Sequence, residues 1–359
     1  MADIPVFVVV PVWNGAEELP DFLSSLKASG DSQRISLVVV DNASADDSLE
    51  IIAKGYPEAH IIKNTENRAF AGGCNQGMEY ALSQGAEYVF LANQDLSFGA
   101  GWLTPLLADF QANPHLGAVQ SVIMRSPDKE KYNAYGNAMH YLGYGYARAD
   151  GQTPQQWRAM PRQVPFFYCS GAAVMYSCAA LKIVGLFDGW FFMYHEDTDL
   201  SWRLRLAGYD LAIAEESRVY HHYEFSRSIQ KFYYIERNRL IILLKNYRLG
   251  TLVVLAPMLV VMELGQVLAS VVEVLKGGKA LTLKEKLRTY AYFLSLGNWR
   301  TIWQARRATQ RLRRVPDRII VQRCADVVLF QEFKNPLLTY VANPMTRAYW
   351  WVVRWCIVW

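Results

Sequence analysis

The sequence lacks the motifs of several common nucleotide-binding and metal-binding proteins. No GxGxxG follows the first apolar run and no GxxxxGK[ST] occurs, which argues against a dinucleotide site and a P-loop. The five cysteines are scattered, odd in number and form no CxxC, which favours a reduced compartment over a zinc site or a disulfide framework. The chain has no internal repeat and does not open on a charged-then-apolar signal segment, so we expect its N-terminal half to fold in the cytoplasm.

Apolar and aromatic side chains are abundant instead. They make up 52% and 13% of the residues, with 11 Trp and 21 Tyr. A soluble domain seldom carries so many tryptophans. Two interpretations are compatible with them: aromatic surfaces that bind sugars, and surfaces at a membrane interface. From Ala280 to Arg318 the chain holds ten Lys or Arg against two acids. Such helices face anionic lipid, nucleic acid or solvent; because apolar helices and a Trp-rich end flank this segment, we expect lipid and not nucleic acid as its partner.

The first part of the chain alternates short β-branched runs with amphipathic segments, which predicts an α/β domain over residues 1–225. We expect strands at 5–12, 35–40, 60–63 and 88–92, with a helix after each of the first three, so the sheet is parallel there. Asn14 is expected to cap the first of these helices. Residues 121–165 lack periodicity and are expected to be a long loop, followed by a strand at 166–176, a helix at 195–207, and a last strand and turn over 211–214 and 218–222.

The remaining chain, 226–359, predicts a helical, membrane-associating region. Residues 251–272 are long enough to span a bilayer, which takes about 20 residues. Glu263 and Gln266 interrupt this run and share one helix face, and an acid near its middle must contact protein, water or headgroups. The pattern leaves three alternatives for residues 251–272: a membrane span, an in-plane interfacial helix or a soluble core helix. Basic amphipathic helices at 280–318 and a Trp-rich tail follow.

Two apolar runs end abruptly in a carboxylate, Asp41 and Asp95. Carboxylates at the carboxyl ends of buried strands are where open α/β sheets hold nucleotides and metals. Asp41 can accept the N3–H of uracil or thymine, or cap the next helix. Asp95 can hold a divalent metal that bridges to a diphosphate. Its neighbours Asn93 and Gln94 are neutral, so a second protein ligand would come from the pair His221 and His222, unless that pair is structural.

A second acidic cluster, Glu196, Asp197 and Asp199, opens a helix after the aromatic run FFMYH. Helix-start acids are favoured by the helix dipole, and Asp199 is four residues before Arg203, which predicts an ion pair within the helix. The aromatic residues before the cluster indicate a pocket instead of an exposed cap. Aromatic walls suit sugar rings and raise the pKa of a carboxylate by desolvation. A carboxylate of this kind is a candidate general base.

With these segments in this order, the chain resembles the family-2 inverting glycosyltransferases of the GT-A fold, particularly bacterial rhamnosyltransferases. The motifs that carry the resemblance are VVVPVWNG, VVVDNAS, NRAFAGGCNQG, ANQD and GLFDGWFFMYHEDTDLSWR, within residues 5–225. The resemblance implies Asp197, beside Glu196, as the general base, and Asp95 and His222 as ligands of Mg²⁺ or Mn²⁺. It implies nucleotide-sugar contacts by Pro11, Asn14, Asp41, Asn67, Phe70, Gly72, Gly73, Asn75, Asn93, Gln94, Asp95 and Gly171.

The family also implies a reaction and a place for it. One sugar would pass, with inversion, from dTDP-rhamnose or a UDP-sugar to a hydroxyl of a lipid-linked or cell-surface glycan, at the cytoplasmic face of the membrane. The QxxRW signature of processive synthases is missing, so we expect one sugar per encounter. Two positions depart from the family pattern: Ala69 replaces a usual glycine, and ANQD holds a single acid. The alternative is a catalytically idle, nucleotide-sugar-binding membrane scaffold.

Overall fold

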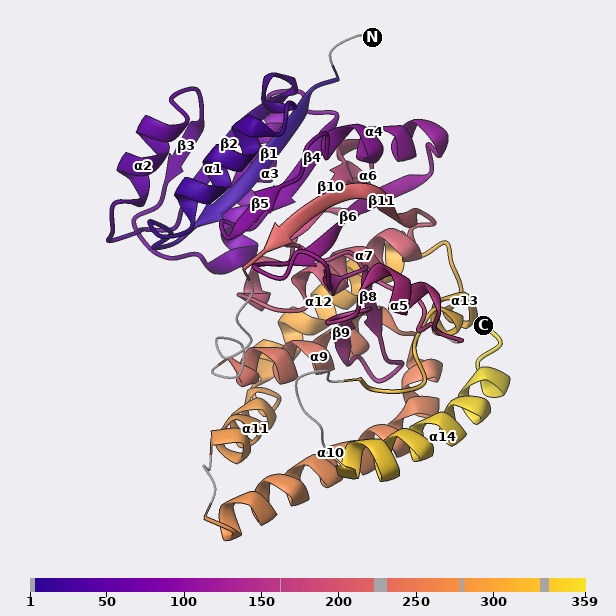
Figure 1. Cartoon of the computed structure of the whole chain (residues 1–359). Coiled ribbons are helices and arrows are strands. Elements are labelled where there is room, and N and C mark those ends of the chain that lie inside the picture. The colour runs from indigo at the N-terminus through magenta and orange to yellow at the C-terminus, as the bar shows by residue number, and fades with distance from the viewer. Residues whose placement is uncertain (1–3, 162, 223–230, 278–280, 330–335) are drawn as a thin grey trace. The chain divides into compact units, whose positions relative to one another are not determined.

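The computed structural model describes residues 4–161, 163–222, 231–277, 281–329 and 336–359. It divides into two compact units, Met1–Asn137 with Ala147–Tyr223, and Ala138–Tyr146 with Glu224–Trp359. Residues 138–146 pack with the second unit, although no sequence pattern indicates this. Figure 1 labels the elements of both units.

The first unit is built on a mixed sheet in the order β3-β2-β1-β4-β10-β6-β11-β5, with β7 paired to β6 (Figure 1). Its strands are β1 (Val6–Val12), β2 (Ile35–Asp41), β3 (His60–Lys63), β4 (Tyr88–Ala92), β5 (Leu96–Phe98), β6 (Leu116–Arg125), β7 (Tyr132–Ala134), β10 (Ala173–Ser177) and β11 (Asp210–His221). Its helices are α1 (Leu19–Ala28), η1 (Ser32–Arg34), α2 (Ser48–Gly55), α3 (Ala69–Ser83), α4 (Leu103–Ala112), α5 (Pro154–Arg158), α6 (Cys178–Val184), η2 (Gly189–Phe191) and α7 (Glu196–Leu206).

The parallel part of the sheet follows directly from the sequence. β1 pairs in parallel with β2 and with β4, and β2 with β3, as the strand–helix alternation predicts. Every residue of β1 is buried, which is the pattern of a strand covered on both faces. Helix α3 packs on β1 and β2. All these strands end at one edge, so the residues that follow them are brought together there.

The rest of the sheet differs from the sequence-based expectation. The predicted loop over 121–165 is wrong, because β6 continues to Arg125 and is buried along nearly its whole length, and further regular elements such as β7 and α5 follow within it. Two polar residues, Gln120 and Ser121, interrupt its apolar run, and both are buried. Their partners are distant in the chain: Gln120 Oε1 accepts from the Ser170 amide at 2.7 Å, and Ser121 Oγ lies 2.8 Å from Ser217 Oγ.

Two further boundaries are corrected. The predicted strand at 166–176 is regular only over β10, which runs antiparallel to β4 and β6. The two predicted segments at 211–214 and 218–222 are one strand, β11, with a register shift between Ala214 and Arg218. A bulge adds unpaired residues to a strand and breaks its alternation, which is why the sequence appears as two pieces.

The second unit is helical. Its elements are α9 (Phe232–Asn246), α10 (Leu249–Leu275), α11 (Leu281–Tyr292), α12 (Leu296–Leu312), α13 (Asp317–Gln322), η3 (Leu338–Ala342) and α14 (Asn343–Cys356). The hairpin of β8 (Asn137–Met139) and β9 (Gly145–Ala147) begins and ends the segment 138–146. Helix α9 packs against α11 and α12, and α10 packs against α11 and α14. Helix α10 continues through Pro257.

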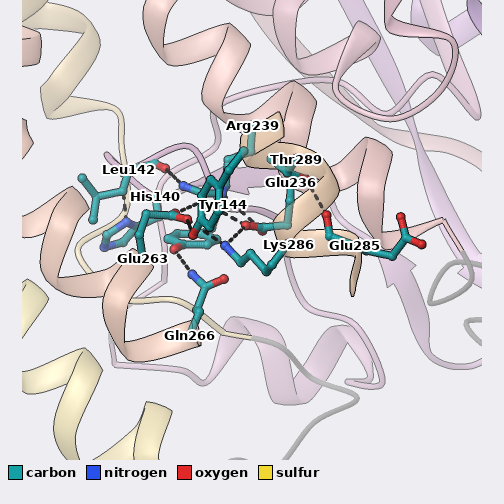
Figure 2. Close-up of polar contacts among 11 residues, drawn as sticks. His140, Leu142, Tyr144, Glu236, Arg239, Glu263, Gln266, Glu285, Lys286 and Thr289 are labelled. Atoms are coloured by element: carbon teal, nitrogen blue, oxygen red, sulfur yellow. Dashed lines mark hydrogen bonds and ion pairs between the residues drawn. The ribbon is translucent and has the colours of Figure 1, made fainter. Parts of the chain in front are cut away.

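A buried ionic network holds α9, α10 and α11 together (Figure 2). Arg239 Nη2 lies 3.0 Å from Glu236 Oε2 and also pairs with Glu263, while Lys286 Nζ lies 2.8 Å from Glu263 Oε2 and pairs with Glu236. The Tyr290 hydroxyl donates to Glu263 at 2.8 Å. The expectation that an acid near the middle of residues 251–272 contacts protein, water or headgroups is confirmed by these contacts of Glu263.

Candidate functional site

Asp41 closes strand β2, where it is paired in register with Val12 and is 2% exposed. Its Oδ1 accepts a hydrogen bond from the Ser44 amide at 3.2 Å. Helix α2 begins after Asp47, so Asp41 is not the cap of that helix. The carboxylate therefore shapes the turn after β2, at the edge where the parallel strands end.

The turn after β1 is tied to the turn after β2. Asn14 is left-handed, with φ +48°, and its Oδ1 accepts from the Ala45 amide at 2.8 Å. The Asn14 amide donates to Ser44 Oγ at 3.0 Å. The prediction that Asn14 caps α1 is wrong, because the cap position is Glu18 and carries no side-chain cap bond. Asn14 instead links the first two motifs, and its nucleotide contact stays a prediction.

The glycines of the third motif serve close packing. A Cβ on Gly73 would lie 2.7 Å from Asn42 Nδ2 and 3.2 Å from Pro11 Cβ, and one on Gly72 would lie 2.9 Å from Arg68 Cβ. The motif also begins in a strained turn, where Asn67 Oδ1 accepts from the amide of Ala69, whose φ is +56°. These contacts fix the start of α3 against β1 and β2.

Asn75 makes a link that the sequence did not indicate. Its side-chain amide donates to the Phe187 carbonyl at 2.8 Å and accepts from the Phe187 amide at 3.0 Å. Asn75 therefore anchors the aromatic segment that leads to the acidic cluster. Whether it also contacts a nucleotide stays a prediction.

At the end of β4, Asp95 faces His221. Their Oδ1 and Nε2 atoms are 3.0 Å apart, and Asn93 Nδ2 lies 3.3 Å from the same ring nitrogen. The ring of His222, the predicted metal ligand, is instead 2.5 Å from Ser126 Oγ. His221 is the last residue of β11 and pairs with Leu96, the residue after Asp95, whereas His222 follows the strand. Gln94 accepts from the Trp13 amide at 2.9 Å through Oε1.

These residues suit a divalent metal only in part. Within the described residues no group of three His, Cys, Asp or Glu side chains is close enough to hold an ion. Asp95 and His221 offer one carboxylate and one imidazole, a set compatible with a divalent ion whose remaining ligands are water or phosphate oxygens. A divalent ion therefore fits between Asp95 and His221 only together with a phosphate-bearing ligand.

The acidic cluster lies at the start of α7 after a strained turn. Phe192, Tyr194 and His195 all have positive φ, at +70°, +65° and +67°. Such strain persists only where surrounding structure enforces it, and it often marks functional turns. Asp197 Oδ2 accepts from the Gly171 amide at 3.0 Å, and its Oδ1 accepts from Thr198.

Asp199 has a structural role. It pairs with Arg203 at 2.8 Å, as the spacing predicts, and both side chains are almost fully buried. The Arg203 guanidinium also donates to the carbonyls of Val184 at 2.6 Å and Leu186 at 2.6 Å. This pair holds the end of α6 beside α7, which leaves Glu196 and Asp197 as the chemical candidates.

Gly171 and Ala172 join the separate motifs into one site. A Cβ on Gly171 would lie 3.0 Å from the Phe70 ring and 3.6 Å from Asp197 Cβ, so the glycine is packed closely between the two side chains. The next residue, Ala172, accepts from the Asn93 amide at 3.0 Å. The third motif, the Asp95 turn and the acidic cluster therefore all meet at residues 171–172.

A family model described as "Glycosyl transferase family 2" matches residues 7–181, which include the first four motifs and Gly171. The chain is a family-2 glycosyltransferase. The glycosyltransferase has the mixed, curled sheet of the GT-A fold in its first unit.

Among curated relatives, the N-acetylglucosaminyl-diphospho-decaprenol L-rhamnosyltransferase of Mycobacterium tuberculosis is 28% identical over 232 residues, 60% of this chain and 75% of the relative. The undecaprenyl-phosphate 4-deoxy-4-formamido-L-arabinose transferase of Shewanella sediminis is 35% identical over 88 residues, 23% of this chain and 25% of the relative. The crystal structure of GalNAc-T7 with UDP, GalNAc and Mn²⁺ matches with a TM-score of 0.53 at 14% identity. That match covers 71% of this chain and 51% of that one. Because the two sequences are only 14% identical, the match supports the fold alone.

The two neighbouring acids of the glycosyltransferase have different environments. Burial raises the pKa of Asp197, while the bonds from Gly171 and Thr198 oppose the rise. Burial and the adjacent Asp197 charge raise the pKa of Glu196 well above its usual range. Glu196 is 5% exposed, and its Oε2 has no hydrogen-bond partner among the described residues. Gly171 and Thr198 donate to the Asp197 carboxylate, whereas the pKa of Glu196 is lowered only by its own backbone amide and is raised by the charge of Asp197. Asp197 therefore ionises first and Glu196 keeps its proton.

Tyr176 is a site neighbour that the sequence did not single out. It lies on β10 and is fully buried, and no described residue is a hydrogen-bond partner of its hydroxyl. The charges of Asp197 and Glu196 are close enough to add to the burial that raises its pKa. The pattern of this strand gives no sequence signal that the Tyr176 hydroxyl lies near an acidic pair.

Proposed function

We propose that this glycosyltransferase moves one sugar, with inversion, from dTDP-rhamnose or a UDP-sugar to a hydroxyl of a lipid-linked glycan. The observation that carries the proposal is the convergence of the three motifs at residues 171–172, with the Asp197 carboxylate held by the Gly171 amide. The rhamnosyltransferase named above acts on a diphospho-decaprenol-linked sugar, which supports a lipid-linked acceptor here.

In the proposed reaction Asp197 is the general base. Its carboxylate takes the proton of the acceptor hydroxyl while that oxygen forms a bond to the anomeric carbon. The bond from the anomeric carbon to the diphosphate breaks on the opposite face, and the nucleoside diphosphate leaves with the electron pair. Glu196, protonated beside it, adds no second negative charge next to the base.

The donor would lie along the edge where the parallel strands end, with its base near Asp41 and its diphosphate near Asp95. One methyl separates thymine from uracil, and a contact of that size discriminates by only about 1–3 kcal/mol. A divalent ion, Mg²⁺ or Mn²⁺, held by Asp95 and His221 would offset the charge that grows on the departing diphosphate. His221 replaces His222 in this proposal because its ring faces Asp95.

The membrane is the proposed location of the reaction. A lipid-linked acceptor stays at the bilayer surface, and the second unit contains a helix, α10, that is long and apolar enough to meet a membrane. We place the enzyme at the cytoplasmic face, where nucleotide sugars are made.

The test uses the purified full chain with a panel of dTDP- and UDP-sugars and a lipid-linked acceptor, with release of nucleoside diphosphate as the readout. We expect Asp197→Asn to lower transfer by about 100-fold to 10,000-fold, the usual contribution of a general base. Nucleotide affinity, measured by calorimetry, should change little. Glu196→Gln is the matched control, because glutamine resembles the neutral acid, and it should keep most of the activity.

Three outcomes would contradict the proposal. Equal losses in both variants, or loss of nucleotide binding with Asp197→Asn, would give the acids a structural role. Absence of sugar release from every donor, with Mg²⁺ or Mn²⁺ present, would favour an idle scaffold.

A further inference from the structure

Helix α10 presents one continuous apolar stripe to the outside of the second unit. Its 27 residues give a length of about 40 Å. An 18-residue window has a mean hydropathy of 2.1, and only 11% of it is buried. The exposed side chains recur at helical spacing along one face: Leu249, Val253, Val260, Val261, Leu264, Leu268, Val272 and Leu275.

The opposite face of α10 is fixed to protein. Leu255, Met258 and Met262 are buried there, and Glu263 is held in the ionic network with α9 and α11 (Figure 2). Helix α11 carries the exposed charges Lys284 and Arg288 beside this contact. A bilayer crossing by α10 would draw the helices packed on it, with these charges, into the hydrocarbon region, where each charge is costly. The orientation of α10 therefore favours lying in the plane of a surface.

Helix α14 lies beside α10 (Figure 1). The two helices run antiparallel, because the Tyr349 hydroxyl donates to the Val254 carbonyl at 2.6 Å and Trp359 Nε1 donates to Thr251 Oγ1 at 3.0 Å. Helix α14 and the residues after it carry large exposed apolar side chains: Trp351, Val352, Trp355 and Val358. We call the exposed apolar side chains of α10 and α14 the α10–α14 face.

A basic edge accompanies the face. The exposed charged residues of α13, its C-cap and α14 are all arginines: Arg318, Arg323, Arg347 and Arg354. The acids nearby, Asp317 and Asp326, are buried. An open groove of about 320 Å³ lies at this edge, lined by Gln322, Trp351, Arg354 and Trp355. Indole rings around a guanidinium form a surface that suits a phosphate headgroup at the boundary between water and lipid.

We propose that the α10–α14 face docks on an anionic phospholipid bilayer with α10 in the plane of the interface, and that Arg354 in the groove binds a lipid phosphate. The arginine edge decides between lipid and a second copy of the chain. A second copy would present the same arginines, and no exposed acid of α13 or α14 to pair with them. Phospholipid phosphates supply the opposite charge. This inference deepens the membrane location in the proposed function, but its test needs neither donor nor acceptor.

The first measurement is flotation of the full chain with vesicles of phosphatidylcholine alone or mixed with phosphatidylglycerol. We expect Leu264→Asp to lower the bound fraction on both vesicles by about tenfold or more, because it places a charge within the apolar stripe. Arg354→Gln should lower binding by about fivefold on phosphatidylglycerol vesicles only, since one basic residue near an anionic surface contributes about that much. Ile183→Asp, an exposed apolar site on α6 of the first unit, is the matched control and should bind as the native chain does.

The second measurement reports depth. In a Cys356→Ser background, where the four remaining native cysteines are buried, the variants Val253→Cys, Leu264→Cys and Leu275→Cys each carry a fluorophore that is quenched by lipids labelled at known depths. An in-plane helix gives the same shallow depth at all three positions. A deep Leu264 between two shallow ends would show a span and overturn the proposal. The proposal would also be overturned if the native chain failed to float with either kind of vesicle. A dimer in sedimentation that Leu264→Asp converts to a monomer would overturn it too, since the α10–α14 face would then bind a second copy of the chain. Circular dichroism of each variant confirms that it is folded.

Discussion

At the scale of single residues, Ala69 marks a place where the backbone is strained. Its φ of +56° belongs to the left-handed region, in which an alanine Cβ costs roughly 1 kcal/mol or more. The Asn67 and Asn42 side chains hold it there through the amide and carbonyl of Ala69. The family pattern has glycine at this position, which adopts the same backbone without that cost.

We therefore expect Ala69→Gly to raise the free energy of unfolding of the first unit by up to about 1 kcal/mol, part of the gain being offset by the entropy of glycine in the unfolded chain. Ala71→Gly, two residues further on inside the same helix, is the control. It should instead lower the free energy of unfolding by about 1 kcal/mol. Denaturant titration measures both, and equal signs for the two variants would contradict the strain argument.

The acidic pair gives a pH-dependent prediction at the same scale. The pKa of Glu196 is raised on folding, so above the ordinary glutamate value of about 4.3 the folded protein binds more protons than the unfolded one. Stability contributed by protonated Glu196 is therefore present at low pH and is lost as the pH rises. Glutamine cannot ionise, so Glu196→Gln should be increasingly more stable than the native protein as the pH rises above about 4.3.

The measurement is the difference in free energy of unfolding between the two proteins at pH 4 and at pH 7. A difference that is the same at both values would mean that Glu196 is not held neutral by its burial.

The pH dependence of catalysis reports on Asp197. Because the pKa of Asp197 is also raised, kcat/KM should begin to fall on the acid side at a pH above the ordinary aspartate pKa of about 3.9.

At the scale of elements, the ionic network fixes how α10 is rotated on its neighbours. Burial alone would raise the pKa of Glu236, but the charges of Arg239 and Lys286 outweigh it and hold the pKa at about 2. The free energy of unfolding that ionised Glu236 contributes is therefore fully present above the ordinary glutamate pKa and is lost as the pH falls toward about 2. Lys286 is fully buried between the two acids.

Lys286→Met should lower the free energy of unfolding of the second unit by about 3–5 kcal/mol, because it leaves buried carboxylates short of a partner. Lys284→Met, at an exposed position of the same helix, should change it by less than about 0.5 kcal/mol. Adding Glu263→Gln to Lys286→Met should cost less than the sum of the two single changes, since one unpaired charge is removed. Additive losses in denaturant titrations would contradict the coupling.

The same scale explains what the sequence could and could not predict. Strands β1, β2 and β4 are continuous apolar runs, so their existence and parallel order follow from pattern alone. Strand β6 was missed because Gln120 and Ser121 are buried polar residues whose partners come from distant parts of the chain.

The choice between His221 and His222 depends on strand register. Strand β11 ends at His221, whose pairing with Leu96 places its ring against Asp95, whereas His222 lies beyond the strand. The role of Gly171 likewise depends on a tertiary contact, between its amide and Asp197. Pattern predicts which residues end the strands, whereas the contacts that unite the site require the folded chain.

At the scale of the whole molecule, the division into two units separates chemistry from the proposed bilayer contact. The acids, Asp95 and Asp41 all belong to the first unit, while the α10–α14 face belongs to the second. If the proposed function and the bilayer contact are both right, damage to the face should affect only reactions whose acceptor is held in a membrane.

Leu264→Asp tests this separation. It should leave donor hydrolysis in solution, and transfer to a water-soluble short-chain acceptor, within about twofold of the native rates, because Leu264 is exposed and lies outside the first unit. Transfer to a long-chain acceptor embedded in phosphatidylglycerol vesicles should fall by about tenfold, since the enzyme no longer shares the surface to which its acceptor is confined. The loss should appear as a higher KM for the embedded acceptor at nearly constant kcat. Equal losses on soluble and embedded acceptors would instead mean that the substitution disturbs the catalytic unit, and an unchanged rate on vesicles would remove the α10–α14 face from the reaction.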